Sequence, residues 1–468
     1  MSGLTIVTLL VVAYGVLGRG GYGRALALGG ATAAGSAIVV SGTAIPTFYA
    51  AALGVVVALV LRLLGSGRTP SRVREPLPPA TSLLVLFLGW SVVVTLVAPL
   101  LFDGLVTVTP GSTPLIAGVV TNSNLAQIIY VFLGVCVVVF LARSPRAGPE
   151  LIGLAAGACT LLSLWRYLHQ LVGLPFPEGF FDNSPSFAYI QTAAGNIPRF
   201  RGILSEPSSL AGSSLVTMAY MLPRASALRG WRQLGALTVA GIACYLGIIS
   251  TSATFVVAGI AAALILGGAS LIGFLARRTS LSRVLSLVGC AAVIVGIWVL
   301  PVVAAFVEST INDKVASSSF TERSSANGDS VNIFLDTWGF GVGLGSARAS
   351  SFIPTLLSAT GIVGALLFTA AVVTLLYRGA ALREYRPVLW ALVTLLVVKI
   401  AAGPDLSDST GVFWLSLGLL SRAALLNSRL PVDRVEAVDP SAPPSAPPLG
   451  DGLPRLEPRP STSGPALP

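Results

Sequence analysis

The chain has 468 residues, of which 54% are hydrophobic and only 10% are charged, and its formal net charge is +10. Soluble globular proteins carry about 25% charged residues, so this composition excludes a soluble globular fold and indicates a protein that crosses a membrane repeatedly. The basic excess is almost entirely arginine placed between apolar segments, which is typical of membrane topology and argues against nucleic-acid binding. The four cysteines lie inside apolar segments without CxxC spacing, so we interpret them as packing residues.

Apolar segments long enough to cross a hydrocarbon core of about 30 Å recur along the chain. We predict spans at residues 3–18, 25–41, 45–64, 82–101, 124–142, 151–172, 207–223, 234–250, 252–275, 284–303, 352–377, 387–402 and 410–428. They predict an all-α polytopic membrane domain over residues 1–428 with about 12 to 13 transmembrane helices. The first segment has no basic region before it and no cleavage site, so we interpret it as a span and not as a removed signal peptide.

Arginine clusters occupy alternate loops, and this alternation sets the predicted orientation. The clusters lie at residues 19–24, 68–74, 143–146, 224–232, 277–283 and 378–386. Because cytoplasmic loops hold the arginine excess, the N-terminus is predicted outside and the C-terminus inside. Residues 429–468 are rich in Pro and lack the apolar content to pack, so they predict a disordered cytoplasmic tail, either merely solvated or a docking site for cytoplasmic partners.

Four arginines run against this topology. The predicted extracytoplasmic loops cover residues 102–123, 173–206 and 304–351. Arg199, Arg201, Arg323 and Arg348 all fall within them, although arginines that only anchor helices would stay inside. Ionisable side chains beside a membrane usually mark the path of a substrate or ion. We therefore expect an anion to bind outside the membrane.

The first candidate group precedes the predicted span 207–223. Arg199 and Arg201 are followed by Glu206, Pro207 and Ser208. Pro is favoured at the first position of a helix and a carboxylate near its N-terminus, so Glu206 can be a helix-start residue with the arginines as its ion-pair partners. The functional alternative is that the guanidinium groups bind phosphate oxygens, with donors added by the helix N-terminus.

The second candidate group lies in the last outer loop. Glu322 and Arg323 are followed by a run of alternating glycines that includes Gly341 and Gly343, and then by Arg348. Alternating glycines permit conformations closed to other residues and allow a ligand or another chain segment to approach closely. The spacing does not match a dinucleotide-binding motif. The structural alternative is a flexible glycine turn into the next span.

A third group of polar residues lies at the outer ends of spans. Ser250 and Ser252 sit between two successive spans, where their hydroxyls either satisfy a broken helix or line a polar pocket. Arg166 and His169, the only histidine, share one face of the sixth predicted span. His169 has no partner at metal or nucleophile spacing. Arg166 either extends toward the membrane surface or faces the same cavity as the outer arginines.

Three of these motifs, in this order, resemble the bacterial O-antigen ligase and polymerase family. Arg199–Ser208 is similar to the family's Arg-x-x-Gly and Glu-Pro-Ser motif, and Ser250–Ser252 to the Ser-x-Ser that follows. Phe340–Ser346 and Thr360–Gly364 resemble the glycine run that closes the large outer loop and the helix after it. The similarity covers about residues 120–425, and each motif is weak alone.

The resemblance implies a multi-span glycosyltransferase of the GT-C type in a bacterial inner membrane. The family's ligases place a His after the glycine run, whereas this chain has Ala347–Ser351 there with no His. The polymerase branch, which relies more on arginines, is therefore the better fit. The implied partners are a polyprenyl-diphosphate-linked oligosaccharide, membrane lipid, and flippase and chain-length-regulating envelope proteins, with no cofactor.

The resemblance also implies a mechanism. One lipid-linked glycan would donate its sugar to a hydroxyl of a second glycan, with the diphosphate as leaving group. Arg199, Arg201 and Arg323 would neutralise the growing charge, and Glu206 or Glu322 would accept the hydroxyl proton. Substrate contacts would come from Arg166, Ser250, Ser252, Glu322, Arg348, Gly341 and Gly343. No Asp-x-Asp or His/Cys cluster occurs in the outer loops, so the reaction need not use a metal.

Three alternatives stay open. An O-antigen-ligase-like enzyme would transfer the glycan to a lipid or another acceptor. A transporter or flippase would use the same arginines to recognise an anionic substrate in transit, but we would then expect polar residues through the membrane midplane. Few charged residues fall inside predicted spans, among them Arg166 and Lys399. A non-catalytic scaffold would suit the Pro-rich tail and leave the outer arginines unexplained.

Overall fold

The computed structural model describes most of the chain outside its last 40 residues. The described residues are 3–17, 22–32, 37–40, 43–65, 77–107, 113–185, 189, 199–275, 318–408 and 410–428. Contacts divide the chain into Met1–Ser428 and Arg429–Pro468, and every described residue belongs to the first unit. The predicted span 284–303 and the predicted tail 429–468 lie outside the described residues.

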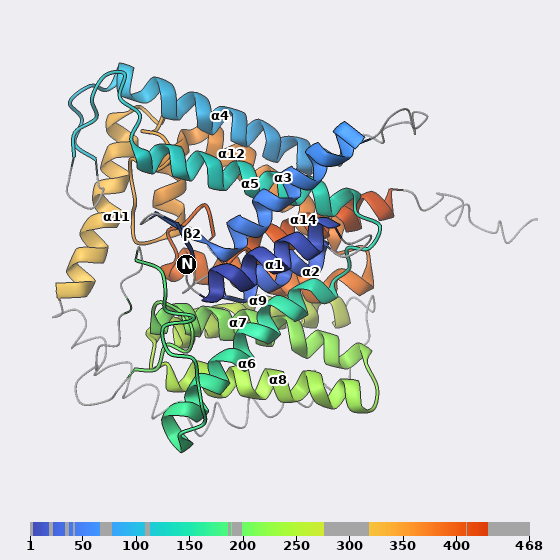
Figure 1. Cartoon of the computed structure of the whole chain (residues 1–468). Coiled ribbons are helices and arrows are strands. Elements are labelled where there is room, and N and C mark those ends of the chain that lie inside the picture. Colours follow the sequence, from blue (N-terminus) through green and yellow to red (C-terminus); the bar gives the residue numbers. More distant parts are fainter. Residues whose placement is uncertain are drawn as a thin grey trace, which may run out of the picture. The chain divides into compact units, whose positions relative to one another are not determined.

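Helices dominate the described residues (Figure 1). The first half contains α1 (Gly3–Leu17), α2 (Tyr22–Thr32), α3 (Thr47–Gly65), α4 (Pro79–Leu101), α5 (Asn122–Arg143) and α6 (Glu150–Val172). The second half contains α7 (Pro207–Ala227), α8 (Trp231–Ile249), α9 (Ala253–Leu275), α11 (Ser318–Asp336), α12 (Phe352–Gly379), η1 (Arg383–Tyr385), α13 (Arg386–Ala402) and α14 (Val412–Asn427). Two short antiparallel strands, β1 (Ala37–Val40) and β2 (Thr43–Pro46), form a hairpin.

Many of these helices suit a membrane. Within the described ranges, seven are long and apolar enough to cross it: α4, α5, α6, α8, α9, α12, and α13 taken together with η1. Helices suit lipid because they satisfy their own backbone hydrogen bonds. Large apolar side chains are exposed on their surfaces, such as Leu264 on α9 and Leu100 on α4, as expected for contact with lipid tails. The chain is therefore a multi-span helical membrane protein.

The predicted span at residues 25–41 is wrong as a single helix. The helix α2 has 11 residues, and its glycines allow close packing, because a Cβ on Gly29 would lie 3.1 Å from the Thr47 carbonyl oxygen. The chain then continues as the β hairpin. The Ala37 N–H donates to Asn183 Oδ1 at 2.9 Å, so this edge of the hairpin is satisfied by a loop far away in sequence. The helix and strand together return the chain to the end where Asn183 lies, which preserves the predicted alternation of loops.

The centre of the bundle is α14. Its residues from Val412 to Ser421 are all buried, and it packs between α5 and α12. Trp414 donates from Nε1 to the Ser407 carbonyl at 2.9 Å, and Gly134 on α5 leaves room for its ring. Around this axis α4 packs on α12, and α7 packs on α8 and α13 (Figure 1). These pairs hold the helix ends that carry the predicted site residues.

Two ends of the bundle differ in their connections. At one end Asn124 donates to the Leu344 carbonyl at 2.6 Å, and Arg348 pairs with Asp405 at 3.1 Å. The connections α4–α5, α6–α7, α8–α9, α11–α12 and α13–α14 therefore gather there. We call this the outer end, after the predicted topology, and the opposite end, with the connections α5–α6, α7–α8 and α12–α13, the inner end.

Candidate functional site

The segment before α7 is fixed against α6 and α8. The Phe200 N–H donates to the Ile249 carbonyl at 3.5 Å, and the Ile203 N–H donates to Ser163 Oγ at 3.4 Å. Gly202 has a φ of +60°, and a Cβ there would lie 2.5 Å from Ser163 Oγ, so glycine is needed at this turn. Arg199 and Arg201, which flank Phe200, are therefore attached to a rigid stretch of backbone.

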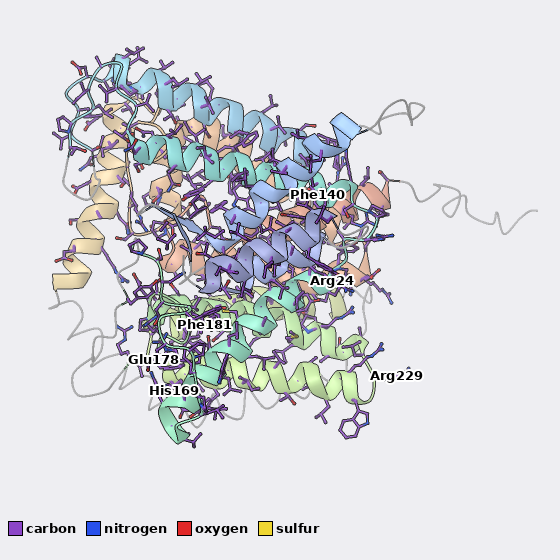
Figure 2. All side chains as sticks on the ribbon, viewed as in Figure 1. Arg24, Phe140, His169, Glu178, Phe181 and Arg229 are labelled. Carbon is purple, nitrogen blue, oxygen red and sulfur yellow. The ribbon has the colours of Figure 1, made fainter. Side chains whose placement is uncertain are left out.

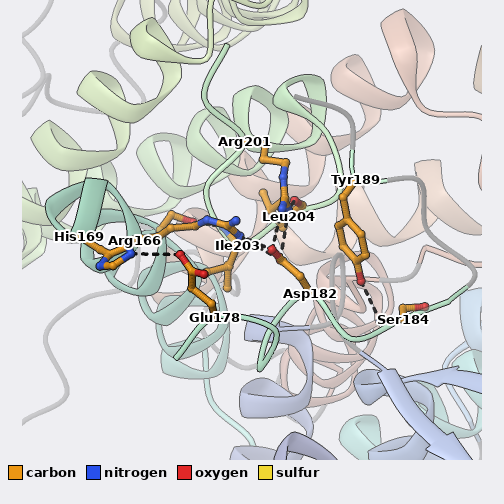
Figure 3. Close-up of polar contacts among 10 residues, drawn as sticks. Arg166, His169, Glu178, Asp182, Ser184, Tyr189, Arg201, Ile203 and Leu204 are labelled. Carbon is orange, nitrogen blue, oxygen red and sulfur yellow. Dashed lines mark hydrogen bonds and ion pairs between the residues drawn. The ribbon is translucent and has the colours of Figure 1, made fainter. Parts of the chain in front are cut away.

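Arg201 points into the protein. Its side chain is buried, and its two terminal nitrogens donate to both carboxylate oxygens of Asp182 at 3.1 and 2.6 Å (Figure 3). It also donates to the Leu204 carbonyl at 2.7 Å and lies over the Tyr189 ring at 4.9 Å. Arg166 of α6 pairs with the same carboxylate at 2.7 Å. Asp182 thus bridges the two guanidinium groups, and both arginines have protein partners.

The end of α6 is closed by aromatic and polar contacts. The Arg166 guanidinium lies 5.7 Å from the centre of the Phe176 ring. His169 contacts the Leu174 carbonyl with Nδ1 at 2.8 Å and Glu178 Oε1 with Nε2 at 3.2 Å. Both ring nitrogens of His169 are therefore occupied within the α6–α7 connection. Arg166 extends toward this connection, where it shares Asp182 with the outer Arg201.

Arg199 lies among charges of a different kind. Burial, and secondly the positive charge of Arg323, lower the pKa of the Arg199 guanidinium, while Glu206 opposes that shift. The buried Nε of Arg199 has no hydrogen-bond partner among the described residues. Two arginines from distant parts of the sequence and one carboxylate therefore lie close enough to interact electrostatically. Three of the four predicted catalytic residues come together here, whereas Arg201 is committed to Asp182.

Glu206 connects this charge group to a cavity. It is the residue before α7, but its side chain makes no capping hydrogen bond and instead accepts from Ser208 Oγ at 2.9 Å. A cavity of about 230 Å³ opens beside it, between α7, α13 and the α13–α14 connection. Its polar lining includes Glu206, Ser208, Ser213, Arg348, Lys399, Asp405 and Asp408. This cavity is smaller than the roughly 300 Å³ at which ligand pockets usually begin, and one side chain or one sugar hydroxyl group can enter it.

A buried lysine forms one wall of the cavity. Lys399 is 5% exposed, pairs with Asp408 at 3.3 Å and donates to the Asp405 carbonyl at 2.8 Å. Its ammonium group also lies 5.9 Å from the Phe352 ring centre and 5.7 Å from that of Phe413. A charge at the end of a span is tolerated when it is paired in this way. Lys399 therefore fastens α13 to the connection that follows it.

The α13–α14 connection carries two carboxylates, and Asp405 is the one that points outward. Asp408 is held inward, because it accepts from the Phe413 N–H at 2.9 Å and from Thr410 Oγ1 at 3.0 Å. Asp405 instead pairs with Arg348 at 3.1 Å, and the two side chains are 41% and 59% exposed. An exposed ion pair contributes little to stability. Separating Arg348 from Asp405 therefore costs little free energy, and either side chain can then bind a ligand.

The predicted serine pair caps a corner between helices. Ser250 is buried and donates to the Gly247 carbonyl at 2.6 Å, and Ser252 Oγ accepts from the Thr254 N–H at 3.3 Å. Both hydroxyls satisfy helix ends, as the structural alternative predicted. Between them Thr251 has a φ of +47°, and its buried hydroxyl has no partner among the described residues. Contact of Ser250 and Ser252 with a substrate stays a prediction.

The glycine run packs against other helices. Gly341 and Gly343 have φ values of +88° and +93°, conformations that favour glycine. A Cβ on Gly343 would lie 2.6 Å from Thr95 Cα on α4, and one on Gly341 would lie 2.7 Å from the backbone nitrogen of Gly361 on α12. The close approach is therefore to this chain's own helices, and a substrate contact at these glycines stays a prediction.

The run also repairs a break in α12. Gly361 has a φ of +66° inside that helix, so the regular hydrogen bonding stops there. The Val342 N–H donates to the Ser358 carbonyl at 2.8 Å, and the Gly343 N–H donates to the Ala359 carbonyl at 3.0 Å. The carbonyls that the break frees are thereby satisfied by the loop.

Glu322 and Arg323 lie on a helix that the sequence did not predict. The helix α11 falls inside the predicted loop 304–351, and its polar composition hid it from a search for apolar segments. Both side chains are exposed. Asn327 holds α11 in place, since its Oδ1 accepts from the Ser351 N–H at 3.1 Å, and α11 packs on α12. Arg323 is thus carried on a helix that is held in place, and its charge acts on Arg199.

Sequence reasoning missed Asp405 and Asp408. They lie between the predicted spans 387–402 and 410–428, in a short connection whose Gly-Pro and Asp-Ser content marked it as a turn. The available signal was that these two carboxylates lie close in sequence to Lys399, which is the one charge in its predicted span. Within the described ranges no group of three or more His, Cys, Asp and Glu side chains is placed to hold a metal ion.

Comparisons with known proteins do not add to this geometry. No known protein family matches the chain, and no curated protein matches it in sequence. The class that the fold defines is the multi-span helical membrane protein, and the site defines a charge group and a cavity at its outer end.

Proposed function

We propose that the protein transfers a glycan from a polyprenyl-diphosphate carrier to an acceptor hydroxyl at the outer face of a bacterial inner membrane. The observation that carries this proposal is the electrostatic grouping of Arg199 with Arg323 and Glu206, of which Glu206 lines a polar cavity. Among the described residues no carboxylate bridges these two arginines, and such a pair suits a diphosphate, because guanidinium groups bind phosphate oxygens in a fork geometry. Polymer extension is the favoured form of the reaction, as the family resemblance implies.

In the proposed step, the acceptor oxygen attacks the anomeric carbon of the donor sugar. The bond from that carbon to the diphosphate oxygen breaks, and the diphosphate leaves with the electron pair. Arg199 and Arg323 stabilise its growing negative charge, a role worth about 3 to 4 kcal/mol for a well-placed donor. The acceptor's proton passes to Glu206, which lines the cavity and already accepts one hydrogen bond, from Ser208.

The remaining predicted residues take supporting roles in this proposal. Arg201 positions the segment that carries Arg199, because its guanidinium is bound to Asp182. Arg348 contacts the acceptor glycan at the cavity entrance after releasing Asp405. Glu322 lies next to Arg323 on the exposed face of α11 and does not line the cavity, so we favour Glu206 as the base.

The transporter alternative is less well supported. It requires ionisable groups along the membrane midplane. Arg166 and Lys399 lie inside predicted spans, and both reach partners in outer-end connections, namely Asp182 and Asp408. Their charges are thereby held at one end of the bundle, which supports a site at the outer face over a path through the membrane.

The test is glycan transfer in proteoliposomes supplied with polyprenyl-diphosphate oligosaccharide. Arg199→Ala and Arg323→Ala should each lower the rate by about 100- to 1000-fold, whereas Arg229→Ala, an exposed arginine of the inner end, should not. The yield of folded protein is compared by size-exclusion chromatography. A wild-type protein that moves labelled substrate across the bilayer without joining sugars would establish the transporter instead, and normal product from both variants would refute the proposed clamp.

A further inference from the structure

A large groove lies at the inner end, far from the candidate site. It has a volume of about 1430 Å³ and runs between α1, α2 and the connection from α5 to α6. Its apolar wall includes Leu10 and Tyr14 of α1, Leu28 of α2 and Phe140 of α5. Leu10 and Tyr14 are 64% and 81% exposed. The volume exceeds the 300 to 1000 Å³ typical of sites for small ligands, which indicates a long or branched occupant.

The floor of the groove includes Tyr22, whose side chain is fixed by its contacts. Tyr22 at the start of α2 donates its hydroxyl to the Ala51 carbonyl at 2.5 Å, and its ring meets Phe140 edge-on at 6.0 Å. Gly15 and Gly54 lie against that ring, and a Cβ on Gly15 would come within 2.8 Å of it. These contacts hold Tyr22 from several sides, so its ring is a fixed part of the groove lining.

The mouth of the groove is basic. Arg24, Arg143 and Arg146 line it and are exposed, and Glu150 is the one acidic residue in the described lining. Figure 2 shows Arg24 and Phe140 on the same side of the inner end, so that charge and apolar wall adjoin. Three arginines against one glutamate leave a positive mouth above an apolar trough, which is the charge distribution complementary to an anionic amphiphile.

We propose that this groove binds one phospholipid with an anionic headgroup from the inner leaflet. The acyl chains lie along α1 against Leu10 and Tyr14, and the headgroup phosphate lies on Arg24, Arg143 and Arg146. Basic pockets between transmembrane helices on the cytoplasmic side bind anionic headgroups, and guanidinium groups match phosphate geometry. The proposal does not depend on the activity proposed for the outer end.

Topology alone does not account for this arrangement. The positive-inside rule requires arginines in inner connections but no cavity beside them. Arg229 in the α7–α8 connection meets that requirement and is not part of the groove lining, and it lies apart from Arg24 in Figure 2. It therefore serves as a matched control, with the same charge and the same end of the bundle.

The test is titration of the purified full-length protein with phosphatidylglycerol or phosphatidylcholine, followed by native mass spectrometry. Phosphatidylglycerol should bind more tightly than phosphatidylcholine. Arg24→Gln should weaken phosphatidylglycerol binding about fivefold, and Arg24→Gln combined with Arg146→Gln about 25-fold, whereas Arg229→Gln should leave it unchanged. Leu10→Trp, which fills the trough and keeps every arginine, should also weaken it, whereas Leu264→Trp on the exposed face of α9 should not.

Several outcomes would overturn the proposal. Equal affinity for the two lipids would show that the groove does not select charge. An equal loss in Arg24→Gln and Arg229→Gln would reduce the effect to general attraction by the inner end. Competition by soluble glycerol phosphate at the same affinity as the lipid, together with no effect of Leu10→Trp, would identify a phosphate site without a lipid.

Discussion

Arg199 and Arg201 are two residues apart on one rigid segment, and their surroundings are opposite. Arg201 is 4% exposed, and three of its hydrogen bonds go to Asp182 and Leu204. Arg199 is half-buried, has no ion pair among the described residues, and lies near a second positive charge, Arg323. The guanidinium of Arg201 is held by its own protein and supports the fold, whereas we propose that Arg199, beside a like charge, binds an anion.

This comparison teaches why charge alone did not identify the site. In the sequence, all four outer arginines run against the positive-inside rule to the same extent. Their partners separate them. Arg201 belongs to an internal class, because it shares Asp182 with Arg166 of α6, and Arg348 pairs with Asp405, whereas Arg199 and Arg323 form the class that we propose to bind the ligand. Each class predicts a different response to mutation, in stability for the first and in activity for the second.

The largest effect is expected at the shared carboxylate. Asp182→Ala leaves the Arg166 and Arg201 guanidinium groups without their common partner in a partly buried site. Removing one partner of a buried ion pair costs about 3 to 5 kcal/mol. Thermal unfolding in detergent micelles should show this loss, with Asp103→Ala, a carboxylate outside any ion pair among the described residues, as control. An unchanged melting temperature would show that the two arginines need no internal partner.

A somewhat smaller loss is expected at Lys399. Lys399→Met removes the partner of Asp408, which keeps hydrogen bonds from Thr410 and from the Phe413 N–H. We expect about 3 kcal/mol, near the lower end for breaking a buried pair. Rescue by the double variant with Asp408→Asn, measured in the same unfolding experiment, would confirm that the cost comes from an unpaired charge.

The glycine run also packs within the protein, so we expect its substitution to change stability. Gly343→Ala forces a residue with a φ of +93° to carry a Cβ 2.6 Å from Thr95 Cα. The left-handed conformation costs about 1 to 2 kcal/mol, and the clash adds to it. Gly328→Ala on α11, where nothing lies within 4 Å, should instead raise stability by up to about 1 kcal/mol. Equal effects of the two substitutions would contradict the packing role of Gly343.

The smallest effect on stability is expected at Arg323. The side chain is exposed on α11, so Arg323→Ala should change the free energy of unfolding by less than about 0.5 kcal/mol. The same variant should lose glycan transfer, as proposed above. If Arg323→Ala unfolds as easily as Asp182→Ala, the separation into two classes fails.

The sequence predicted the helical membrane domain well. Most predicted spans match helices within a few residues, because long apolar runs leave the chain few other structures in lipid. It failed at residues 25–41, where glycines allow a short helix to pack closely and a hairpin to follow, and at α11, whose polar residues carry no span signal.

The site was predicted in its residue types and not in its pairings. Arg199, Glu206 and Arg323 could be selected because charge is rare in the chain. That Asp182 would bind Arg201, and that Asp405 would reach Arg348, depends on how distant connections meet at the outer end. Such contacts follow from helix packing, and one sequence contains no direct signal for them.

The joint between the glycine run and the break in α12 has a consequence for how this chain can change over time. Val342 and Gly343 are attached to Ser358 and Ala359 by main-chain atoms alone. Any residue except proline can donate such a bond, so Val342 is free to vary as long as its replacement fits the space. The glycines cannot vary, since their conformations exclude other residues. Across descendants of this chain, divergence should therefore erase most of the loop while leaving the alternating glycines and Gly361 in place.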